Sequence, residues 1–546
     1  MDCTVSQRLR IIRAPPGFFR EIGAAGLISV APGAVASTQR QSPEDGSTRN
    51  RGRQARRRRQ ITIAGATERT KGRPLAALDE TLAPGEGRND HKDLIAADAR
   101  HVLHPWADLS AMSDEDALVV QDAKGVHVQD SEGKTYLDAI GGMWCMTVGY
   151  GRDELVDAMA DQARKMTYYT PFGDVSSEPA ARLAQKLAEL SPGDLNRVHF
   201  TTCGSTAIDS AVRIAHYYHA SQGQPERRHV LSRKNAYHGS TYLAASLCGK
   251  AADRTLFQYE KDFVHHLSSP GYDADIAEES SEQRLAELLA EMEAKIEELG
   301  PETVAAFVAE PILASGGVLV PPEGYQKATR ELCAKHGILY ISDEVVTGFG
   351  RLGHFFASEV RFGIVPDMII TAKGITSGYQ PLGAVLISDR IADAIGESAP
   401  ENKPVFSNGY TYSGHPVACA TALKNIEIME REDIPGHVRE VGPYFMKRLR
   451  ELTDLPIVYT VRGDHLMACV ECWTGEEAGP TAKNMALAQR VDSYCQSAGL
   501  LVRPYENLCI LSPPLIVGRA QIDKIVTILE DALLRAAKDL ACGAFE

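Results

Sequence analysis

Two short apolar runs, Ile338–Ile341 and Met368–Ile370, constrain the fold of this chain more than any other feature. Each run follows a Gly or a Pro and leads to a polar residue, Asp343 after the first and Lys373 after the second. Apolar runs of this length are typical of buried strands in a parallel sheet. Because ligands of open α/β sheets gather outside the carboxyl ends of the strands, the sequence predicts a carboxylate and an amine in one crevice.

The same pattern repeats over residues 197–387, where short strands alternate with helices and Gly or Pro marks the turns. This alternation predicts an α/β fold with a doubly wound, mainly parallel sheet covered by helices on both faces. After about residue 440 the elements become shorter and mixed, which indicates a smaller α+β domain. We expect four segments: an Arg-rich extension over 1–88, an N-terminal segment joining the small domain over 89–140, a large domain over 141–405 and a small C-terminal domain over 406–546.

Charge and cysteine content narrow the class of protein. Residues 1–74 hold fourteen Arg and one Lys against five acidic residues, so they carry +10 while the whole chain carries −14. The remaining body is strongly acidic, which argues against nucleic acid as its main partner. No run of 18 or more apolar residues occurs, so we expect no membrane partner. One CxxC pair, Cys469 and Cys472, lacks a second Cys or His pair at metal-ligand spacing, and we expect no metal site.

Residues 1–88 carry RQARRRRQ at 53–60 among scattered Gly, Pro and Ser, and this composition predicts disorder. Three interpretations remain open for this extension. It has no function, it is a mitochondrial transit peptide, which is typically Arg-rich and acid-poor, or it is an interaction tail that uses Arg56–Arg59. The scattered cysteines suit a reducing compartment. We therefore expect a cytoplasmic protein, or a mitochondrial one if the extension is a transit peptide.

A strand, a Gly-Ser turn and a helix follow one another around residue 204. The strand begins at Arg197, the turn holds Gly204 and Ser205, and the helix places Ile208 and Val212 on one face. This order directs free backbone N–H groups and the helix dipole at a phosphate. The chain has neither GxxxxGK[ST] nor a GxGxxG strand-turn-helix unit here, which argues against a nucleotide P-loop and a Rossmann dinucleotide site.

Aromatic and basic candidates lie at other predicted elements. Tyr237 follows a predicted strand, where its ring can stack on a flat cofactor or simply pack. Trp144, in the Gly-rich loop 141–151, either anchors that loop or lines a substrate pocket. Arg503 lies on a predicted strand of the small domain, and a guanidinium fork suits a carboxylate.

Together these motifs resemble those of the class III pyridoxal-phosphate (PLP) aminotransferases, in the ω-transaminase or amine or ω-amino acid:pyruvate branch. The resemblance covers most of the chain from His101 to Asp531. It rests on GMWC…VGYG at 142–151, CGSTAIDSA at 203–211, AYHGST at 236–241, AEP…GGVLVPP at 309–322, DEVVTGFGR at 343–351, TAKG at 371–374, YTYSGHP at 410–416 and LSPPL at 511–515. The joint order and spacing of the motifs make it specific.

The resemblance implies the PLP-dependent transferase fold of type I, with the large domain binding PLP. Lys373 would form the Schiff base with PLP and move a proton between the substrate carbon and the cofactor. Asp343 would pair with the pyridinium nitrogen so that the ring can accept electrons. The further cofactor contacts it implies are Gly204 and Ser205 at the phosphate, Tyr237 and Val345 on the two faces of the ring, and Thr411 at the phosphate from the other subunit of a homodimer.

The resemblance also implies a substrate pocket with Trp144, Trp106, Glu310 and Arg503. Arg503 would bind the carboxylate of pyruvate or of an amino acid, and Glu310 can pair with an arginine when that carboxylate is absent. Thr206 stands where many class III enzymes carry an acidic residue. The resulting GST form is similar to the pyruvate-linked members, including the taurine:pyruvate and β-alanine:pyruvate types, and favours pyruvate as acceptor.

We therefore predict a PLP-dependent aminotransferase that moves an amino group from an amine or ω-amino acid to a keto acid, with pyruvate favoured, by a ping-pong mechanism. One alternative is an aminomutase or decarboxylase of the same fold, which would use the same lysine and aspartate. Another is a catalytically silent protein of this fold that acts through its Arg-rich segment. Arg503 and the pyruvate-type motif favour transfer over the former, and the intact Lys373 and Asp343 argue against the latter.

Overall fold

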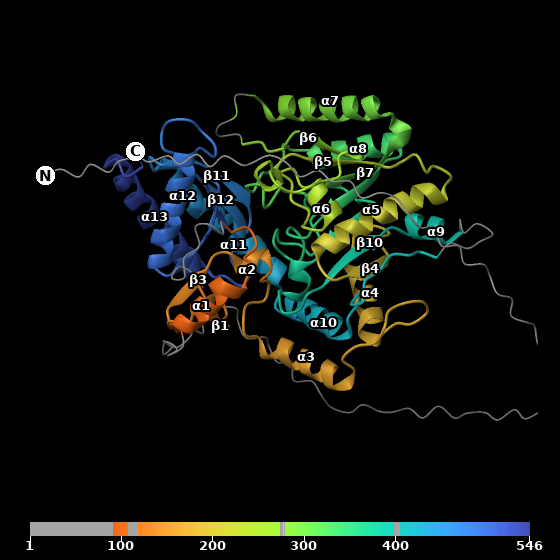
Figure 1. The fold of residues 1–546 in the computed structure, drawn as a ribbon, viewed down its shortest axis with the longest axis horizontal. Helices are drawn as coiled ribbons and strands as arrows, with labels where there is room; N and C mark the ends of the chain where they lie inside the picture. The colour runs from red at the N-terminus through yellow and green to blue at the C-terminus, as the bar shows by residue number, and fades with distance from the viewer. Residues whose placement is uncertain (1–90, 108–117, 274–276, 278, 398–404, 546) are drawn as a thin grey trace, which may run out of the picture. The chain divides into compact units, whose positions relative to one another are not determined.

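The computed structural model describes residues 91–107, 118–273, 277, 279–397 and 405–545 (Figure 1). The chain divides into two units, Met1–Arg69 and Thr70–Glu546, and every described residue belongs to the second. The predicted Arg-rich extension over 1–88 lies outside the described residues. Within the described ranges, no helix has the length and apolar character needed to cross a membrane.

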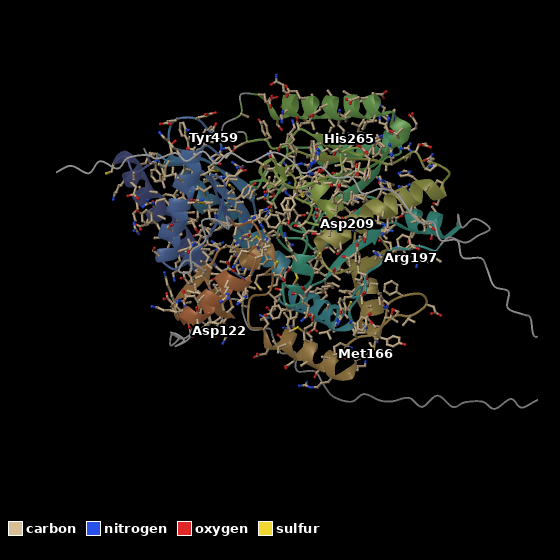
Figure 2. All side chains as sticks on the ribbon, viewed as in Figure 1. Asp122, Met166, Arg197, Asp209, His265 and Tyr459 are labelled. Carbon is tan, nitrogen blue, oxygen red and sulfur yellow. The ribbon has the colours of Figure 1, made fainter. Side chains whose placement is uncertain are left out.

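A seven-stranded sheet in the order β4-β10-β9-β8-β7-β5-β6 forms the centre of this unit. Its strands are β4 (Arg197–Thr201), β5 (His229–Arg233), β6 (Val264–Leu267), β7 (Val304–Ala309), β8 (Leu339–Asp343), β9 (Met368–Thr371) and β10 (Gly383–Ile387). Neighbouring strands from β9 to β6 run parallel, whereas β10 is antiparallel to both β9 and β4. Arg197 and His265 mark the two edge strands (Figure 2). The predicted α/β fold with a mainly parallel sheet is confirmed.

The central strands β7, β8 and β9 are buried throughout because helices cover both faces of the sheet. Consecutive residues of β8 point to opposite faces, so Tyr340 and Ile341 belong to two different apolar clusters. On one face α5 (Gly204–Ser221) packs on β9 and β10, and on the other α7 (Ser281–Leu299) and α8 (Tyr325–His336) cover the sheet (Figure 1). Each fully buried Ile, Leu or Val side chain contributes about 1.5–3 kcal/mol to folding.

Two further four-stranded sheets occur in the described ranges. One joins β1 (Val120–Lys124), β2 (His127–Asp130) and β3 (Thr135–Asp138) to β13 (Leu500–Leu501); the other has the order β11 (Val458–Asp464), β12 (Met467–Cys472), β15 (Leu508–Leu511) and β14 (Arg503–Tyr505). β3 pairs with β13 in parallel, so the N-terminal segment shares a sheet with the C-terminal part. This pairing supports the proposal that 89–140 joins the small domain over 406–546, beside a large domain over 141–405.

The other α-helices of the described residues precede, follow or lie between these strands along the chain. They are α1 (His91–His101), α2 (Gly141–Trp144), α3 (Asp153–Lys165), α4 (Glu178–Leu190), α6 (Tyr242–Leu247), α9 (Asp389–Glu397), α10 (Pro416–Arg431), α11 (Ile434–Arg450), α12 (Ala482–Ser497) and α13 (Arg519–Ala541). α10 packs on α3 and α4, so the first helix of the proposed small domain contacts elements of the proposed large one.

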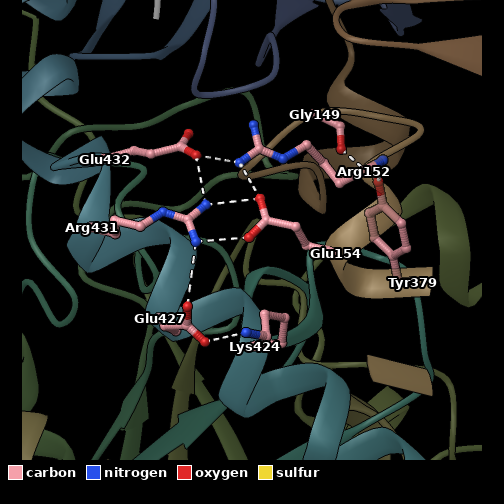
Figure 3. A network of polar contacts seen from close by, with 8 residues as sticks. All are labelled: Gly149, Arg152, Glu154, Tyr379, Lys424, Glu427, Arg431 and Glu432. Carbon is pink, nitrogen blue, oxygen red and sulfur yellow. Dashed lines mark hydrogen bonds and ion pairs between the residues drawn. The ribbon is translucent and has the colours of Figure 1, made fainter. Parts of the chain in front are cut away.

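A network of charged side chains joins the start of α3 to the end of α10 (Figure 3). The Arg431 guanidinium donates to both carboxylate oxygens of Glu154, at 2.7 and 2.8 Å. Arg152 forms an ion pair with Glu432, which also accepts from Arg431 at 3.1 Å. Every charge in this network therefore has a partner of opposite sign.

One tyrosine, Tyr379, links the network to the loops around the predicted site. The hydroxyl of Tyr379 donates to the carbonyl oxygen of Gly149 at 2.9 Å and accepts from the backbone N–H of Arg152 at 2.8 Å (Figure 3). Tyr379 lies shortly after Lys373, and Gly149 lies in the Gly-rich loop 141–151. One hydroxyl thus holds these two loops together.

Candidate active site

A cavity of about 380 Å³ lies where β7, β8 and β9 end. Seven of the residues singled out in the sequence line it: Gly204, Ser205, Tyr237, Glu310, Asp343, Val345 and Lys373. The other four, Trp106, Trp144, Thr411 and Arg503, are not among its lining residues. The crevice expected at the carboxyl ends of the strands is therefore present, and it contains the carboxylate and the amine.

Asp343 is the last residue of β8 and is buried. Its Oδ1 accepts from the backbone N–H of Val345 at 3.1 Å, and its Oδ2 lies 2.7 Å from Nδ1 of His238. The second ring nitrogen of His238, Nε2, is buried and has no hydrogen-bond partner among the described residues. A carboxylate at Nδ1 favours the tautomer with its proton there, so His238 donates to Asp343 and holds it in one orientation.

Lys373 begins the short 3₁₀-helix η4 (Lys373–Thr376), directly after β9. Its φ of 46° lies in the left-handed region that L side chains rarely adopt. The side-chain amide of Asn425, on α10, donates to the carbonyl oxygens of Gly374 and Ile375 at 2.9 and 3.1 Å and thereby fixes this turn. Burial lowers the pKa of the Lys373 amine, although the nearby Cys145 and Asp343 oppose this shift. A less basic amine is closer to the neutral form that a base or nucleophile needs.

Helix α5 begins at Gly204 beside the cavity, with its first-turn N–H groups at that end. The hydroxyl of Thr206 accepts from the backbone N–H of Cys203 at 3.1 Å, a contact that an acidic residue at this position can also make. A Cβ on Gly204 would lie 3.1 Å from Cγ2 of Val345, and one on Gly239 would lie 2.3 Å from Oγ of Ser205. Glycine at both positions keeps open the space next to the helix N-terminus, where an anion is favoured.

Glu310 follows β7 and is buried, and its carboxylate accepts two backbone hydrogen bonds. The N–H of Tyr237 donates to Oε1 and the N–H of Ala314 donates to Oε2, both at 3.0 Å. Burial raises the pKa of this carboxyl. The Arg233 guanidinium bonds to the carbonyl oxygen of Glu310, at 2.6 Å, so in this structure the Glu310 carboxylate pairs with the backbone rather than with an arginine side chain.

The two tryptophans differ in their surroundings. Trp144 is buried in an apolar cluster with Ile312, Val318 and Ile510, so in this structure it anchors the Gly-rich loop. Trp106 is exposed, and its ring meets that of Tyr237 edge-on at 5.8 Å between centroids. Both tryptophans are therefore next to the cavity wall, Trp106 through the ring of Tyr237 and Trp144 through its cluster with Ile312.

Thr411 and Arg503 lie outside the cavity lining, and they differ in their surroundings. Thr411 is exposed, and its carbonyl oxygen accepts from the hydroxyl of Tyr168 at 2.8 Å. Arg503, on β14, is half-buried, and burial lowers the pKa of its guanidinium. Its positive charge in turn lowers the pKa of both Lys373 and Lys250.

Sequence reasoning missed three residues of this site, namely His238, Cys145 and Lys250. His238 and Cys145 line the cavity, and Lys250 bonds to Ser315, which also lines it. His238 could have been noticed, since it directly follows Tyr237 at a predicted strand end. Its partner Asp343 lies 105 positions further along, and no sequence pattern links the two.

Comparison with known proteins gives an independent finding. The family described as Aminotransferase class-III matches residues 110–533. The chain is 38% identical to a putrescine–pyruvate aminotransferase of Pseudomonas aeruginosa, over 80% of this chain and 95% of that protein. It is 36% identical to a mitochondrial gamma-aminobutyrate transaminase 1 of Oryza sativa subsp. japonica, over 79% of this chain and 84% of that protein. An (S)-enantioselective omega-transaminase structure from Thermomicrobium roseum matches with a TM-score of 0.78 and 38% identity, covering 83% of this chain and 100% of that one.

Proposed function

The chain belongs to the class III aminotransferases, which depend on PLP, and from this premise we propose that it moves an amino group from an amine or ω-amino acid to pyruvate. One observation carries the proposal: Lys373 and Asp343, from the ends of the adjacent parallel strands β9 and β8, line one cavity. The relatives named for putrescine and for gamma-aminobutyrate support both donor classes, and the former supports pyruvate as acceptor.

The residues around the cavity fit PLP. The start of α5 suits its phosphate, and Gly204 leaves beside Val345 the space that a Cβ would fill. We assign the phosphate to Gly204 and Ser205, and the two ring faces to Tyr237 and Val345. When bound, PLP supplies an electron sink for negative charge on the substrate carbon.

The chain's own residues provide orientation and proton transfer. We propose that Nζ of Lys373 attaches the cofactor, and then holds and moves the proton of the reacting substrate carbon. Asp343 would face the pyridine nitrogen and favour positive charge there, and His238 would keep the Asp343 carboxylate in place. We further propose that Arg503 binds the carboxylate of pyruvate through its guanidinium fork, with Trp106, Trp144 and Glu310 shaping the pocket.

We propose that the working form is a homodimer in which Thr411 reaches the partner's site. Exposed apolar side chains surround one open pocket near Thr411, and they include Tyr169, Phe172 and Val405. Exposed apolar groups gathered in this way are typical of a subunit interface. Sedimentation should give twice the chain mass, and a monomer at micromolar concentration would overturn this part of the proposal.

The compartment also belongs to the proposal. We propose a cytoplasmic location, with a mitochondrial one if residues 1–88 direct import, and the name of the rice relative supports the second arrangement. A fusion of residues 1–88 to a fluorescent protein distinguishes the two locations. Mitochondrial fluorescence would show that these residues direct import, and diffuse fluorescence would show that they do not.

The main experiment measures alanine formation. Purified, PLP-loaded protein is mixed with pyruvate and each member of a panel of amines and ω-amino acids. We expect alanine to accumulate together with the carbonyl product of the donor. If no donor yields alanine with pyruvate, the acceptor assignment fails, and if no keto acid is aminated at all, transfer itself fails.

A further inference from the structure

A second positive side chain, Lys250, lies beside the cavity. It is only 4% exposed, and its Nζ donates to Oγ of Ser315 at 3.2 Å. The same nitrogen lies 3.8 Å from the ring centroid of Tyr505 and 5.6 Å from that of Tyr237. Because Ser315 and Tyr237 both line the cavity, Nζ of Lys250 lies next to its wall.

Lys250 has no counter-charge at close range. Within the described part of the chain, no carboxylate lies within ion-pair distance of its Nζ. The carboxylates of Asp253, Glu310 and Glu506 influence it only from farther away. Burial lowers the pKa of Lys250 to about 8, with the charge of Arg503 acting in the same direction. Below pH 8 the amine is nevertheless mainly charged.

Arg503 likewise lacks a counter-charge at close range among the described residues. It is half-buried, and no described carboxylate forms an ion pair with it. Buried charges in proteins are normally paired, because leaving water without a partner is costly. A buried lysine kept without a counter-ion beside a cavity therefore indicates a ligand that brings its own negative charge.

We propose that Lys250 forms an anion subsite that selects amine donors ending in a carboxylate over donors ending in a second amine. The inference rests on the proposed function and narrows its donor class to ω-amino acids. An ω-amino acid carries its negative charge at the end remote from the reacting amine, where Lys250 can donate to it. A diamine of the same length brings a positive charge to that end and is repelled.

The test uses three donors with the same four-carbon chain, each with pyruvate: 4-aminobutanoate, 1,4-diaminobutane and butylamine. The values of kcat/KM for 4-aminobutanoate and 1,4-diaminobutane, which carry a second charged group, are divided by the value for butylamine, which does not. This division cancels any general effect on catalysis. The variants are Lys250→Met, which keeps the apolar stem, and Lys250→Arg, which keeps the charge. Lys234→Met is the matched control, because Lys234 lies close by in the sequence but is exposed.

We expect Lys250→Met to lower the normalised 4-aminobutanoate value by about 10-fold or more, the effect of losing one charge-assisted hydrogen bond. The normalised 1,4-diaminobutane value should rise, while Lys250→Arg and Lys234→Met keep the wild-type preference. Calorimetry of butanoate, which carries the carboxylate but no amine, should show about 10-fold weaker binding to PLP-loaded Lys250→Met.

Two results would overturn the inference. One is an unchanged ratio of kcat/KM for 4-aminobutanoate to kcat/KM for 1,4-diaminobutane in Lys250→Met, and the other is unchanged butanoate binding. Either would occur while the wild type still forms alanine, and so would leave the proposed function intact. Failure of the wild type to form alanine from any donor is a different result, and it would count against the proposed function itself.

Discussion

The charges of the α3–α10 network and the charges beside the cavity follow opposite rules. In the network, Arg152 and Arg431 each form an ion pair with a carboxylate, and Glu154 and Glu432 each pair with an arginine. Beside the cavity, Lys250 is more deeply buried than any of these but has only a hydroxyl and aromatic rings for partners. Paired charges hold elements together, whereas unpaired buried charges cost stability and persist where a ligand uses them.

The largest expected effect concerns Lys373. Lys373→Ala should lower alanine formation by at least about 1,000-fold, because both the attachment point and the proton carrier are lost. Mass spectrometry after borohydride reduction should find PLP bound to Lys373 in the wild type and to no residue in the variant. Lys424→Ala, which removes a lysine paired with Glu427 in the network, is the control and should keep the wild-type rate. Stable PLP attachment in Lys373→Ala would contradict the assignment.

The next effect concerns Arg503. Arg503→Ala should raise the KM for pyruvate by about 10- to 100-fold, the cost of losing charge-assisted hydrogen bonds to a carboxylate. The KM for butylamine should change much less, because this donor has no carboxylate. Arg431→Gln removes a guanidinium from the network and should leave both constants as in the wild type. Equal increases for pyruvate and butylamine would remove the carboxylate-binding role.

A smaller effect concerns the stability cost of the buried Lys250 charge. Its pKa is about 8 in the folded chain against 10.5 for an ordinary lysine, so the charged form costs up to about 3 kcal/mol of stability. This cost is fully present below pH 8 and disappears as the pH rises from 8 toward 10.5. Lys250→Met should therefore raise the free energy of unfolding at pH 7, and this gain should shrink above pH 8. Denaturant unfolding at several pH values measures it, and a loss of stability at pH 7 would show that the amine is structurally required.

The smallest effect is expected in the network. Glu154→Gln should lower the free energy of unfolding at pH 7 by about 1 kcal/mol or less, since partly exposed ion pairs contribute little. The hydrogen bonds from Arg431 lower the pKa of the Glu154 carboxyl. Its contribution is therefore present above the ordinary pKa of a glutamate and is lost as the pH falls through the lowered value. A difference between variant and wild type that persists at pH 2 would contradict this account.

Local patterns predicted much of this site. Asp343 and Lys373 could be found because each follows a buried apolar run, and the carboxyl ends of neighbouring parallel strands meet at one edge of a sheet. Gly204 could be singled out as a cavity residue because a strand, a turn and a helix in that order direct free backbone N–H groups at an anion. In each case the relevant physics acts within a few residues of the chain.

Long-range contacts could not be predicted in this way. The apolar run of β10 indicates a strand, but an apolar run carries no information on direction, and β10 is antiparallel to both neighbours. The contacts of Lys250 with Ser315 and Tyr505 join three distant segments. The same limit explains why His238 was passed over as the partner of Asp343.

One element boundary was wrong for a local reason. Among the shorter elements expected after about residue 440, the first is a helix over 440–453, whereas α11 spans Ile434–Arg450. The side chain of Asp433 accepts from the N–H of Gly436 at 3.0 Å, and Pro435 lies in the first turn, where its missing N–H costs nothing. Pro435 and Gly436 therefore belong to the capped start of the helix.

The parallel pairing of β3 with β13 has a consequence for synthesis of the chain. About 360 residues separate the two strands, so at translation rates of about 5–20 residues per second β3 leaves the ribosome about 20–70 seconds before its partner. During that time the N-terminal hairpin presents an unpaired strand edge, which is a site for wrong pairing with other chains. The yield of folded protein should therefore depend on translation speed and on chaperones. Truncation before Leu500 should remove the strand with which β3 pairs.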